Sequence, residues 1–522
     1  MFSIVGWSKG AIGLHYYFGN RAYFDNLNGF KIQFQPSLKQ SRNFESANSF
    51  KLMKKSILIF LFSFGVYWGS FGQAKEEFNI LLIHVDDLGW ADIGVFGSDF
   101  YETPFIDRLA AEGMLFTHSY AAAAICSPSR AALMTGKYPA RIGITDWIYA
   151  RFQGVGTTGL PGEYAENPDQ PLRTPKNQGF LLLEELTLAE RLKAQGYTTF
   201  HVGKWHLGEE ENYPEKQGFD RNFGGNDLGQ PPSYFDPYEP ATPTPFYAFD
   251  RVTPRDPGEY LTDREGDEIV DFLQSQAHKF FIHWAPYAVH TPIMAPQELV
   301  EKYKAKAGGK QKNPIYAAMV ENLDQNVGKV LAALDRLKLT DKTLVIFTSD
   351  NGGLIGNPTN PITNNYPLKS QKGYPYEGGI RVPTVVKWPG QVAAGKQSAL
   401  PIATFDWVPT ILDYLGLDPR EQGLDGQSLA GVLKGGTLGA RDLFWHFPHY
   451  RGPDVVPYSI IRSGDFKLIH YFGERPDELF SLTNDPGETT NLAAQFPEIV
   501  TQLKESLQAW WNETGARLPQ KK

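Results

Sequence analysis

The sequence predicts an α/β protein with a large mixed, mostly parallel sheet flanked by helices, and a smaller C-terminal α/β subdomain containing a short antiparallel sheet. Continuous apolar runs recur along the chain, as expected for strands that are buried on both faces of a sheet. Helical stretches separate these runs, which is typical of a doubly wound α/β domain. After about residue 415 the strands become short, and this change predicts the second subdomain.

Four apolar runs are predicted as strands of the large sheet, and each leads to a group of polar residues. The ends of parallel strands meet at one edge of a sheet, where ligands bind in this fold class. Helices are predicted over residues 187–194 and 316–337, between these strands. The predicted strands cover residues 78–85, 198–202, 279–284 and 343–348.

The predicted organisation is a catalytic domain over residues 75–414 and a C-terminal subdomain over residues 415–522. Segments 150–180 and 208–262 are rich in Gly, Pro and aromatic residues, so we expect long loops over the site there. In the C-terminal subdomain a closing helix is predicted over residues 499–512. Its short antiparallel strands are predicted at residues 458–462, 466–471 and 478–481.

Residues 53–74 have the form of a signal peptide, with Lys54 and Lys55 before an apolar run and small residues after it. The run is too short to span a membrane, and no cysteine follows it, so we expect no membrane anchor. Residues 1–52 are interpreted as a wrongly assigned start or a disordered leader. These features predict an exported protein, either periplasmic or secreted.

The net charge of −8, from 50 basic and 58 acidic residues, argues against a nucleic-acid partner. It does not argue against a small anionic substrate, because a few local cations can bind an anion inside an acidic protein. The chain has one cysteine, Cys126, so no disulfide within the chain can form.

Two pairs of oxygen-bearing residues end predicted strands: Asp86-Asp87 and Asp350-Asn351. One such pair alone is more often a turn or a helix cap. Two pairs at the same edge of a sheet predict a metal site. Carboxylate and amide oxygens suit Ca²⁺ or Mg²⁺, whereas Zn²⁺ prefers nitrogen and sulfur.

Cys126 precedes a predicted helix that has Pro128 in its first turn. A free cysteine is usually a buried apolar residue, but a helix N-terminus also stabilises an anion, and Arg130 adds a planar cation. Two further lysines and two histidines follow predicted strands or lie in a Gly-rich loop. Each of them alone would be interpreted as an ordinary surface or core residue, but together with Arg130 they suit the binding of a tetrahedral anion. The remaining members of this set are Lys204, His206, His290 and Lys372.

On these motifs the chain resembles the type I formylglycine-dependent sulfatases of the alkaline phosphatase superfamily, over residues 78–515. The signature Cys-x-Pro-x-Arg begins at Cys126, and the family's other motifs follow in order at residues 203–208, 290–292, 349–352 and 372–383. The resemblance implies that a formylglycine-generating maturation enzyme oxidises Cys126 to Cα-formylglycine. It also implies one Ca²⁺ ion, bound by Asp86, Asp87, Asp350, Asn351 and the group formed from Cys126.

The resemblance further implies roles for the cationic residues. Lys204, His290 and Lys372 resemble the residues that bind sulfate and protonate the leaving group. Arg130 and His206 resemble those that orient and deprotonate the formylglycine diol. One oxygen of the diol would attack sulfur, and the covalent sulfate would leave as the aldehyde forms again.

The expected partner is a sulfated carbohydrate, because aromatic loops and paired polar donors suit a sugar. The segment 446–451 supplies three candidate substrate contacts, His446, His449 and Arg451. A purely structural loop is an equal alternative for this segment. The resemblance to bacterial enzymes favours exo-acting hydrolysis of algal galactan, ulvan or glycosaminoglycan fragments, with 4- or 6-sulfated galactose or N-acetylgalactosamine preferred. Alternatives are a phosphonate monoester or phosphodiester hydrolase, and a non-catalytic binder of sulfated glycans.

Overall fold

A mixed sheet forms the centre of the protein in the computed structural model, which describes residues 77–149, 159, 162–240, 249–421 and 423–522. Within these residues the sheet has nine strands in the order β12-β2-β11-β8-β1-β7-β5-β6, and β13 pairs with β2. Residues 76–522 group into one compact unit. The strands are β1 (Asn79–Val85), β2 (Met114–Tyr120), β5 (Thr198–Gly203), β6 (Arg221–Phe223), β7 (Phe280–Ala285), β8 (Thr343–Ser349), β11 (Arg381–Lys387), β12 (Lys396–Ser398) and β13 (Ile402–Ala403).

The four strands predicted from apolar runs are confirmed as the parallel centre of the sheet, β8-β1-β7-β5. Every residue of β1, β7 and β8 is buried, as strands covered by helices on both faces require. The predicted fold class is therefore confirmed.

Strands β2 and β11 had no prediction, and they make the sheet mixed because β11 runs antiparallel to both β2 and β8. In β2 the polar residues Thr117, His118 and Ser119 interrupt the apolar pattern. In β11 the third residue is Pro383, and the pairing with β2 shifts at that residue. Proline removes a hydrogen bond between strands, so the sequence of β11 does not predict a strand.

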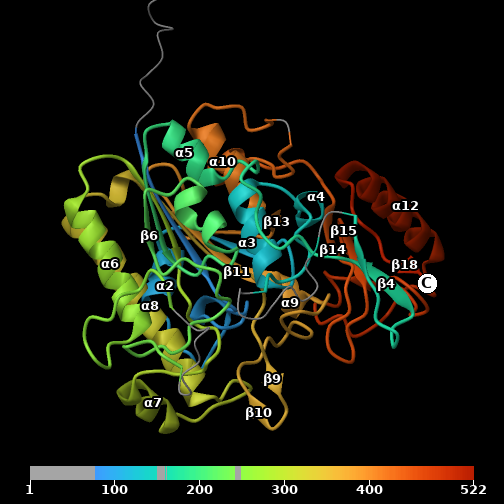
Figure 1. Cartoon of the computed structure of the whole chain (residues 1–522), viewed down its shortest axis with the longest axis horizontal. Helices are drawn as coiled ribbons and strands as arrows, with labels where there is room; N and C mark the ends of the chain where they lie inside the picture. Colours follow the sequence, from blue (N-terminus) through green and yellow to red (C-terminus); the bar gives the residue numbers. More distant parts are fainter. Residues whose placement is uncertain (1–76, 150–158, 160–161, 241–248, 422) are drawn as a thin grey trace, which may run out of the picture. The chain divides into compact units, whose positions relative to one another are not determined.

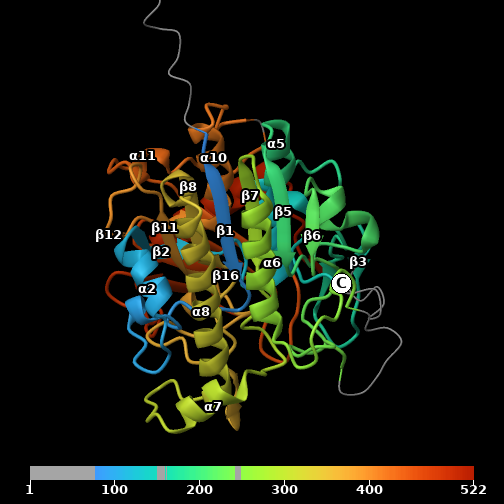
Figure 2. The same cartoon turned by 90° about the vertical axis from the view of Figure 1, so that its left-hand side faces the viewer.

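Helices cover both faces of this sheet. Figure 2 shows α2 (Pro104–Ala111), α6 (Leu261–Ser275) and α8 (Pro314–Arg336) in front of it. Figure 1 shows α3 (Cys126–Thr135), α5 (Leu188–Ala194) and α10 (Trp407–Tyr414) on the other side. Thr187 and Glu190 form a capping box that begins α5, and Asn313 caps α8 by accepting two backbone N–H groups. Further helices are α4 (Pro139–Ile142), α7 (Gln297–Lys304), α9 (Glu377–Ile380) and α11 (Ala430–Leu433).

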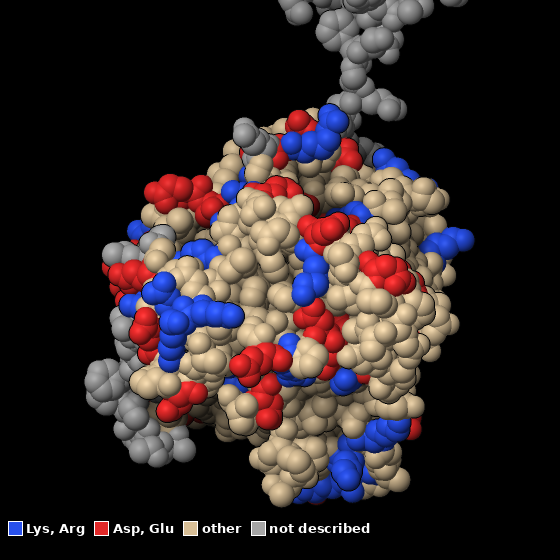
Figure 3. All heavy atoms as spheres, turned by 90° about the vertical axis from the view of Figure 1, so that its right-hand side faces the viewer, with Lys and Arg blue, Asp and Glu red and all other residues tan. Residues whose placement is uncertain are grey.

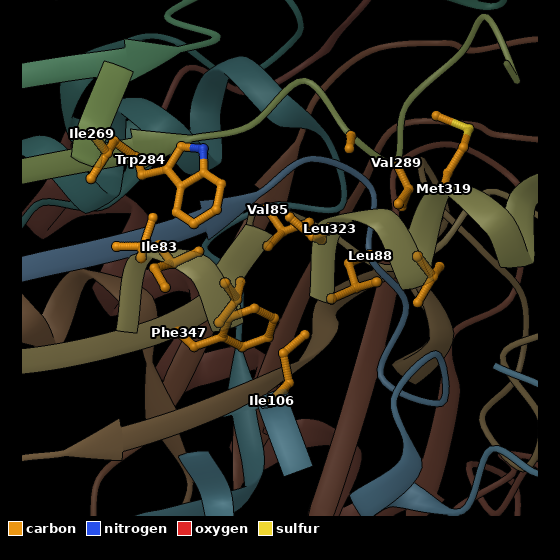
Figure 4. Packing of buried hydrophobic residues seen from close by; sticks show 14 of the residues in the cluster. Ile83, Val85, Leu88, Ile106, Ile269, Trp284, Val289, Met319, Leu323 and Phe347 are labelled. Atoms are coloured by element: carbon orange, nitrogen blue, oxygen red, sulfur yellow. The ribbon is translucent and has the colours of Figure 1, made fainter. Parts of the chain in front are cut away.

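The main hydrophobic core lies between the sheet and helices α2, α6 and α8. Figure 4 shows Ile83 and Phe347 from the sheet packed among Ile106 of α2, Ile269 of α6 and Leu323 of α8. All five are fully buried. Burying each such side chain stabilises the fold by about 1.5–3 kcal/mol, so this core holds the strand ends rigidly in place.

The C-terminal region forms a four-stranded antiparallel sheet in the order β14-β15-β16-β17, with α12 (Pro497–Thr514) packed beside it. The three predicted strands and the helix are confirmed, and β14 (Leu443–Phe447) is additional. His446 therefore lies in a strand, and not in a loop before one. The other strands are β15 (Tyr458–Ser463), β16 (Phe466–Tyr471) and β17 (Glu478–Ser481), with small pairings among β3 (Tyr164–Ala165), β4 (Leu172–Pro175) and β18 (Gln520–Lys521), and between β9 (Gly356–Asn357) and β10 (Asn360–Pro361).

The predicted leader (1–52) and signal peptide (53–74) lie outside the described residues. Among the residues that are described, no helix has the length and apolar character needed to cross a membrane. Figure 3 shows acidic and basic side chains interspersed over the face on the right-hand side of Figure 1.

Candidate active site

The ends of two neighbouring strands bring four oxygen-bearing side chains together. Asp86 and Asp87 follow β1, Asp350 and Asn351 follow β8, and the two strands pair in parallel up to their last residues. The backbone N–H of Asp87 donates to Asp350 Oδ1 (3.1 Å), and Asn351 Nδ2 donates to Asp87 Oδ1 (2.8 Å). All four residues are buried. Asp87 has a φ of 58°, in the left-handed region that few non-glycine residues adopt, Asp and Asn more often than others.

These residues fit a divalent cation. Asp87 Oδ2 and Asn351 Oδ1 are buried oxygens without a hydrogen-bond partner in the described parts of the chain, which is costly unless a ligand binds them. Side-chain atoms of Asp86, Asp87 and His290 lie within 4.8 Å of one another and could hold a metal ion. In contrast, the Asp350 carboxylate is engaged by Arg130 in this structure. The donor set is rich in hard oxygen atoms, which suits Ca²⁺ or Mg²⁺.

Three cationic side chains contact the carboxylates. Lys204 Nζ donates to both oxygens of Asp86 (3.0 and 2.8 Å). Arg130 binds Asp350 Oδ2 through Nε and Nη2, both at 2.8 Å, and donates through Nη1 to the backbone oxygen of Lys204. Lys372 Nζ lies 2.6 Å from Asp87 Oδ1. Three positive and three negative side chains balance, so a divalent cation would leave an excess of positive charge that attracts an anionic substrate.

The pKa values of the carboxyls reflect this balance. Burial raises the pKa of Asp350, but Arg130 and Lys204 outweigh burial and hold the pKa below its ordinary value. Burial also raises the pKa of Asp87, but Lys372, His290 and Lys204 together outweigh burial, and the pKa is lowered. The pKa of Asp86 is raised, because burial there exceeds the effect of Lys204. A cation bound beside Asp86 would offset the free-energy cost of burying its charged carboxylate.

Cys126 is the first residue of α3, and it is buried. Its Sγ lies 3.4 Å from His206 Nδ1, while His206 Nε2 lies 2.8 Å from the backbone oxygen of Ile148. A carbonyl oxygen only accepts, so Nε2 carries the hydrogen and Nδ1 presents a lone pair to residue 126. Burial, with Lys204 adding to it, lowers the pKa of His206 well below its ordinary value. His206 is thus a neutral proton acceptor aimed at residue 126.

His290 has a similar tautomer. Its Nδ1 lies 3.0 Å from the Thr291 backbone oxygen, and its Nε2 lies 3.6 Å from Asp87 Oδ2. Nδ1 therefore carries the hydrogen, and Nε2 faces a carboxylate oxygen with its lone pair. Burial and then the charge of Lys372 lower the pKa of His290 to about 3. Two lone pairs that face each other leave a position suited to a cation or a proton.

The loop that carries Lys372 is fixed from both sides. The N–H of Gly373 donates to the Ala124 oxygen at 2.6 Å, which ties the loop to the segment before Cys126. On the other side, a side chain at Gly352 would place its Cβ 1.9 Å from the Gly378 oxygen. Only glycine allows this close approach of the Asp350-Asn351 loop to the Lys372 loop.

A buried ionic network that the sequence did not reveal supports the same loop. Lys467 Nζ on β16 lies 3.0 Å from Glu377 Oε1 and 2.8 Å from Glu488 Oε1, and all three side chains are fully buried. Glu488 Oε2 accepts the backbone N–H of Glu377 at 2.6 Å. Glu377 lies in the motif of residues 372–383, so the sequence pointed to this one residue of the network. Lys467 and Glu488 come from outside every motif.

The three predicted substrate residues differ in their surroundings. Both ring nitrogens of His446 are bonded inside the protein, to Ser459 Oγ (2.8 Å) and the Arg517 oxygen (3.0 Å), so His446 is a structural residue in this arrangement. His449 Nε2 lies 2.8 Å from Thr145 Oγ1. Arg451 lies against the Lys372 loop, where a Cβ at Gly373 would be 3.1 Å from its Nε.

These features define an α/β protein with a site suited to a divalent cation and an anion, and comparison with known proteins gives its family. The family model described as Sulfatase matches residues 78–417, and the one described as N-sulphoglucosamine sulphohydrolase, C-terminal, matches residues 370–513. The chain belongs to the sulfatase family, of the alkaline phosphatase-like class, and is a sulfuric ester hydrolase.

Relatives match most of the chain. It is 34% identical over 523 residues to a protein named Sulfatase from Formosa agariphila, covering 85% of this chain and 90% of that protein. It is 32% identical over 483 residues to N-acetylgalactosamine-6-sulfatase from Homo sapiens, covering 83% and 87%. The crystal structure of Ps i-CgsB in complex with k-i-k-neocarrahexaose matches with a TM-score of 0.69 at 29% identity, covering 83% of this chain and 93% of that chain.

Proposed function

We propose that this protein is an exported carbohydrate sulfatase that releases sulfate, in exo fashion, from oligosaccharides derived from sulfated polysaccharides. The proposal includes conversion of Cys126 to Cα-formylglycine by a maturation enzyme and binding of one Ca²⁺ ion. The observation that carries it is the placement of Cys126 at the start of α3, 3.4 Å from the proton-accepting Nδ1 of His206. A thiol without a disulfide partner gains a chemical use in that position.

Two groups outside the standard side chains would supply part of the chemistry. Formylglycine at position 126, for which the thiol stands here, would supply a hydrated aldehyde with a nucleophilic hydroxyl. A bound Ca²⁺ would polarise the sulfate ester and lower the pKa of a neighbouring hydroxyl. Residues suited to hold the ion are Asp86, Asp87, Asp350 and Asn351, with the group at position 126.

The chain's own residues position and exchange protons. His206 Nδ1 accepts a proton from the group at position 126, and its bond to Ile148 fixes the ring for that task. Arg130 lies one helical turn along α3 and aligns the Asp350 carboxylate by a hydrogen bond from Nε and an ion-pair contact of Nη2. Lys204 and Lys372 supply positive charge for the sulfate oxygens. Burial lowers the pKa of Lys372, but the negative charges around it, that of Asp87 first, outweigh burial, so the pKa is raised and Lys372 stays protonated. Lys372 is the candidate for protonating the leaving alcohol, and His290 joins it only when the negative charge of a bound sulfate ester favours its protonated form.

The proposed substrate class rests on the relatives. A relative at 32% identity is named N-acetylgalactosamine-6-sulfatase, and the matching crystal structure at 29% identity holds k-i-k-neocarrahexaose. We infer from these that a sulfated galactose or N-acetylgalactosamine residue, sulfated at position 4 or 6, is the preferred substrate. Export of a bacterial enzyme to the periplasm or medium agrees with degradation of external polysaccharide, and it rests on the sequence of residues 53–74.

The test is release of free sulfate from a panel of defined oligosaccharides of carrageenan, ulvan and chondroitin sulfate. The enzyme is co-expressed with a formylglycine-generating enzyme, and conversion of Cys126 is checked by mass spectrometry of its peptide. We expect release from at least one galactose- or N-acetylgalactosamine-containing member, with sulfate removed from the chain end. Absence of release from the whole panel by converted enzyme would overturn the substrate class.

A further inference from the structure

Beside the catalytic residues lie two charged side chains that the mechanism above does not use, Asp146 and Arg451. Asp146 follows α4, twenty residues after Cys126, and Arg451 follows β14 in the C-terminal region. The segments that carry them are joined by the hydrogen bond between Thr145 Oγ1 and His449 Nε2, which is 2.8 Å long and buried. Asp146 and Arg451 are thus held near each other by their neighbours in the chain.

Asp146 is held firmly, yet its carboxylate is mostly unused. The residue is only 6% exposed. Asn177 Oδ1 accepts hydrogen bonds from the backbone N–H groups of Thr145 (2.9 Å) and Asp146 (3.2 Å). Asn177 Nδ2 donates to the backbone oxygen of Asp146 (2.9 Å). Among the described residues, the carboxylate itself accepts one hydrogen bond, from the N–H of Trp147 (2.8 Å). A carboxylate can accept about four, so acceptor capacity remains for a ligand.

Arg451 is also held in place, and its charge has no partner among the described residues. Its backbone pairs with Val455 in both directions, which closes a tight turn. Its Nη1 is buried and has no hydrogen-bond partner, and no ion pair of Arg451 occurs in the part of the chain that the structure describes. The guanidinium packs over Gly373, the residue next to Lys372. An unpaired guanidinium donor in such a place is expected to serve a ligand.

Asp146 and Arg451 interact electrostatically, although no ion pair joins these two described residues. Burial raises the pKa of Asp146 to about 7, and the charge of Arg451 opposes this rise. Beside them the rings of Trp147 and Tyr149 lie 4.4 Å apart and are both partly exposed. A rigid carboxylate, a guanidinium and two neighbouring rings make a set that suits a sugar.

We propose that Asp146 and Arg451 bind hydroxyl groups of the sugar ring that carries the sulfate ester, and so select sugar esters over other sulfate esters. A hydroxyl is the group that donates to a carboxylate and accepts from a guanidinium at once. The aromatic pair Trp147–Tyr149 gives an apolar face for the same ring. This inference rests on the proposed function, because it assigns the sugar to one side of the same site.

The experiment compares a sugar ester with an ester that has no ring hydroxyls. Formylglycine-converted wild type, Asp146→Asn and Arg451→Ala are assayed on 4-nitrophenyl sulfate and on the fastest member of the chondroitin sulfate and carrageenan panel. A hydrogen bond to a charged group contributes about 1.5–3 kcal/mol, so kcat/KM for the sugar ester should fall by about 10- to 100-fold. For 4-nitrophenyl sulfate it should change by less than about threefold, since that substrate makes neither contact.

The exposed pair Asp418 and Arg420, whose side chains are 63% and 90% exposed, provides matched control variants, Asp418→Asn and Arg420→Ala. An equal loss on both substrates, or no loss on the sugar ester, would overturn the inference, as would a wild type that hydrolyses only the aryl ester. If wild type hydrolyses neither ester, the proposed function fails. In that case, calorimetry measures binding of the panel oligosaccharides to Cys126→Ala and to the double variant Cys126→Ala/Asp146→Asn. Equal affinity of the two proteins would overturn the sugar site, and loss of binding in the double variant would support it.

Discussion

At the scale of single residues, the site is defined by which nitrogen of each histidine carries a hydrogen. His206 and His290 each give one N–H to a backbone oxygen, so each presents a lone pair to the reaction space. Burial lowers the pKa of both residues. Both are therefore neutral near pH 7 before a metal or substrate binds, and positive charge in the site comes from Arg130, Lys204 and Lys372.

Replacement of Cys126 by alanine should abolish turnover without unfolding the protein. The thiol is the precursor of the proposed nucleophile, and removing a nucleophile lowers kcat by more than about 10³-fold. The lost side chain is small, so the free energy of unfolding should change by only about 1 kcal/mol. Sulfate release and thermal unfolding measure the two effects. Cys126→Ser should behave in the same way in hosts that do not convert serine, and activity near wild type in either variant would refute the nucleophile.

Binding of Ca²⁺ should stabilise the folded protein through Asp87 and Asn351. A ligand that binds only the folded state adds about 2.7 kcal/mol at a concentration one hundred times its Kd. We expect the melting temperature of chelator-treated protein to rise on addition of Ca²⁺, and this rise to be lost in Asp87→Asn and Asn351→Leu. Asp418→Asn serves as the control, because Asp418 lies in an exposed ion pair. An unchanged rise in both site variants would place the ion elsewhere.

At the scale of elements, the sheet of the C-terminal region supports the catalytic loop. Lys467 on β16 reaches Glu377 at the start of α9, five residues after Lys372. Glu488 accepts the N–H of the same Glu377. The position of Lys372 therefore depends on contacts with residues about one hundred positions later in the sequence.

Lys467→Met should destabilise the protein strongly. It leaves Glu377 and Glu488 buried without their shared cation, and breaking a buried ion pair costs about 3–5 kcal/mol. Lys504→Met is the matched control, because Lys504 on α12 pairs with Asp477 while 46% exposed, and such surface pairs contribute about 0–1 kcal/mol. Denaturant unfolding measures both. Equal effects of the two substitutions would show that the buried network does not stabilise this region.

The elements predicted from the sequence are those with an unbroken local pattern. Apolar runs predicted the four central strands, and polar residues after them predicted the cation and oxygen set, because parallel strands end at one edge. Strand β11 was missed since Pro383 interrupts it. His446 lies in β14 with both ring nitrogens engaged, and Asp146, Lys467 and Glu488 meet the site through contacts across long stretches of chain. Sequence spacing carries no information on such contacts.

At the scale of the whole molecule, stability should fall as the pH rises through the range set by Glu265. Burial raises the pKa of Glu265 on α6 from its ordinary 4.5 to about 8. The folded protein therefore keeps a proton that the unfolded chain loses, so the stabilisation is complete below about pH 4.5 and is lost as the pH rises to about 8. Each pH unit in this window costs at most about 1.4 kcal/mol.

Glu265→Gln should flatten this part of the profile of melting temperature against pH. The amide cannot ionise, so the variant should gain stability relative to wild type between pH 5 and pH 8. Asp271→Asn, on the exposed face of the same helix, should leave the slope unchanged. A Glu265→Gln profile parallel to that of wild type would show that this carboxyl is not the group responsible.

The most direct test of the central claim is a paired assay on one preparation of co-expressed enzyme. Conversion of Cys126 is measured by mass spectrometry, and initial rates are measured on 4-nitrophenyl sulfate and on a 4-nitrophenyl phosphodiester. We predict that sulfate release rises in proportion to the converted fraction and greatly exceeds phosphodiester hydrolysis. Sulfate release independent of conversion, or turnover of the phosphodiester alone, would contradict a formylglycine-dependent sulfatase.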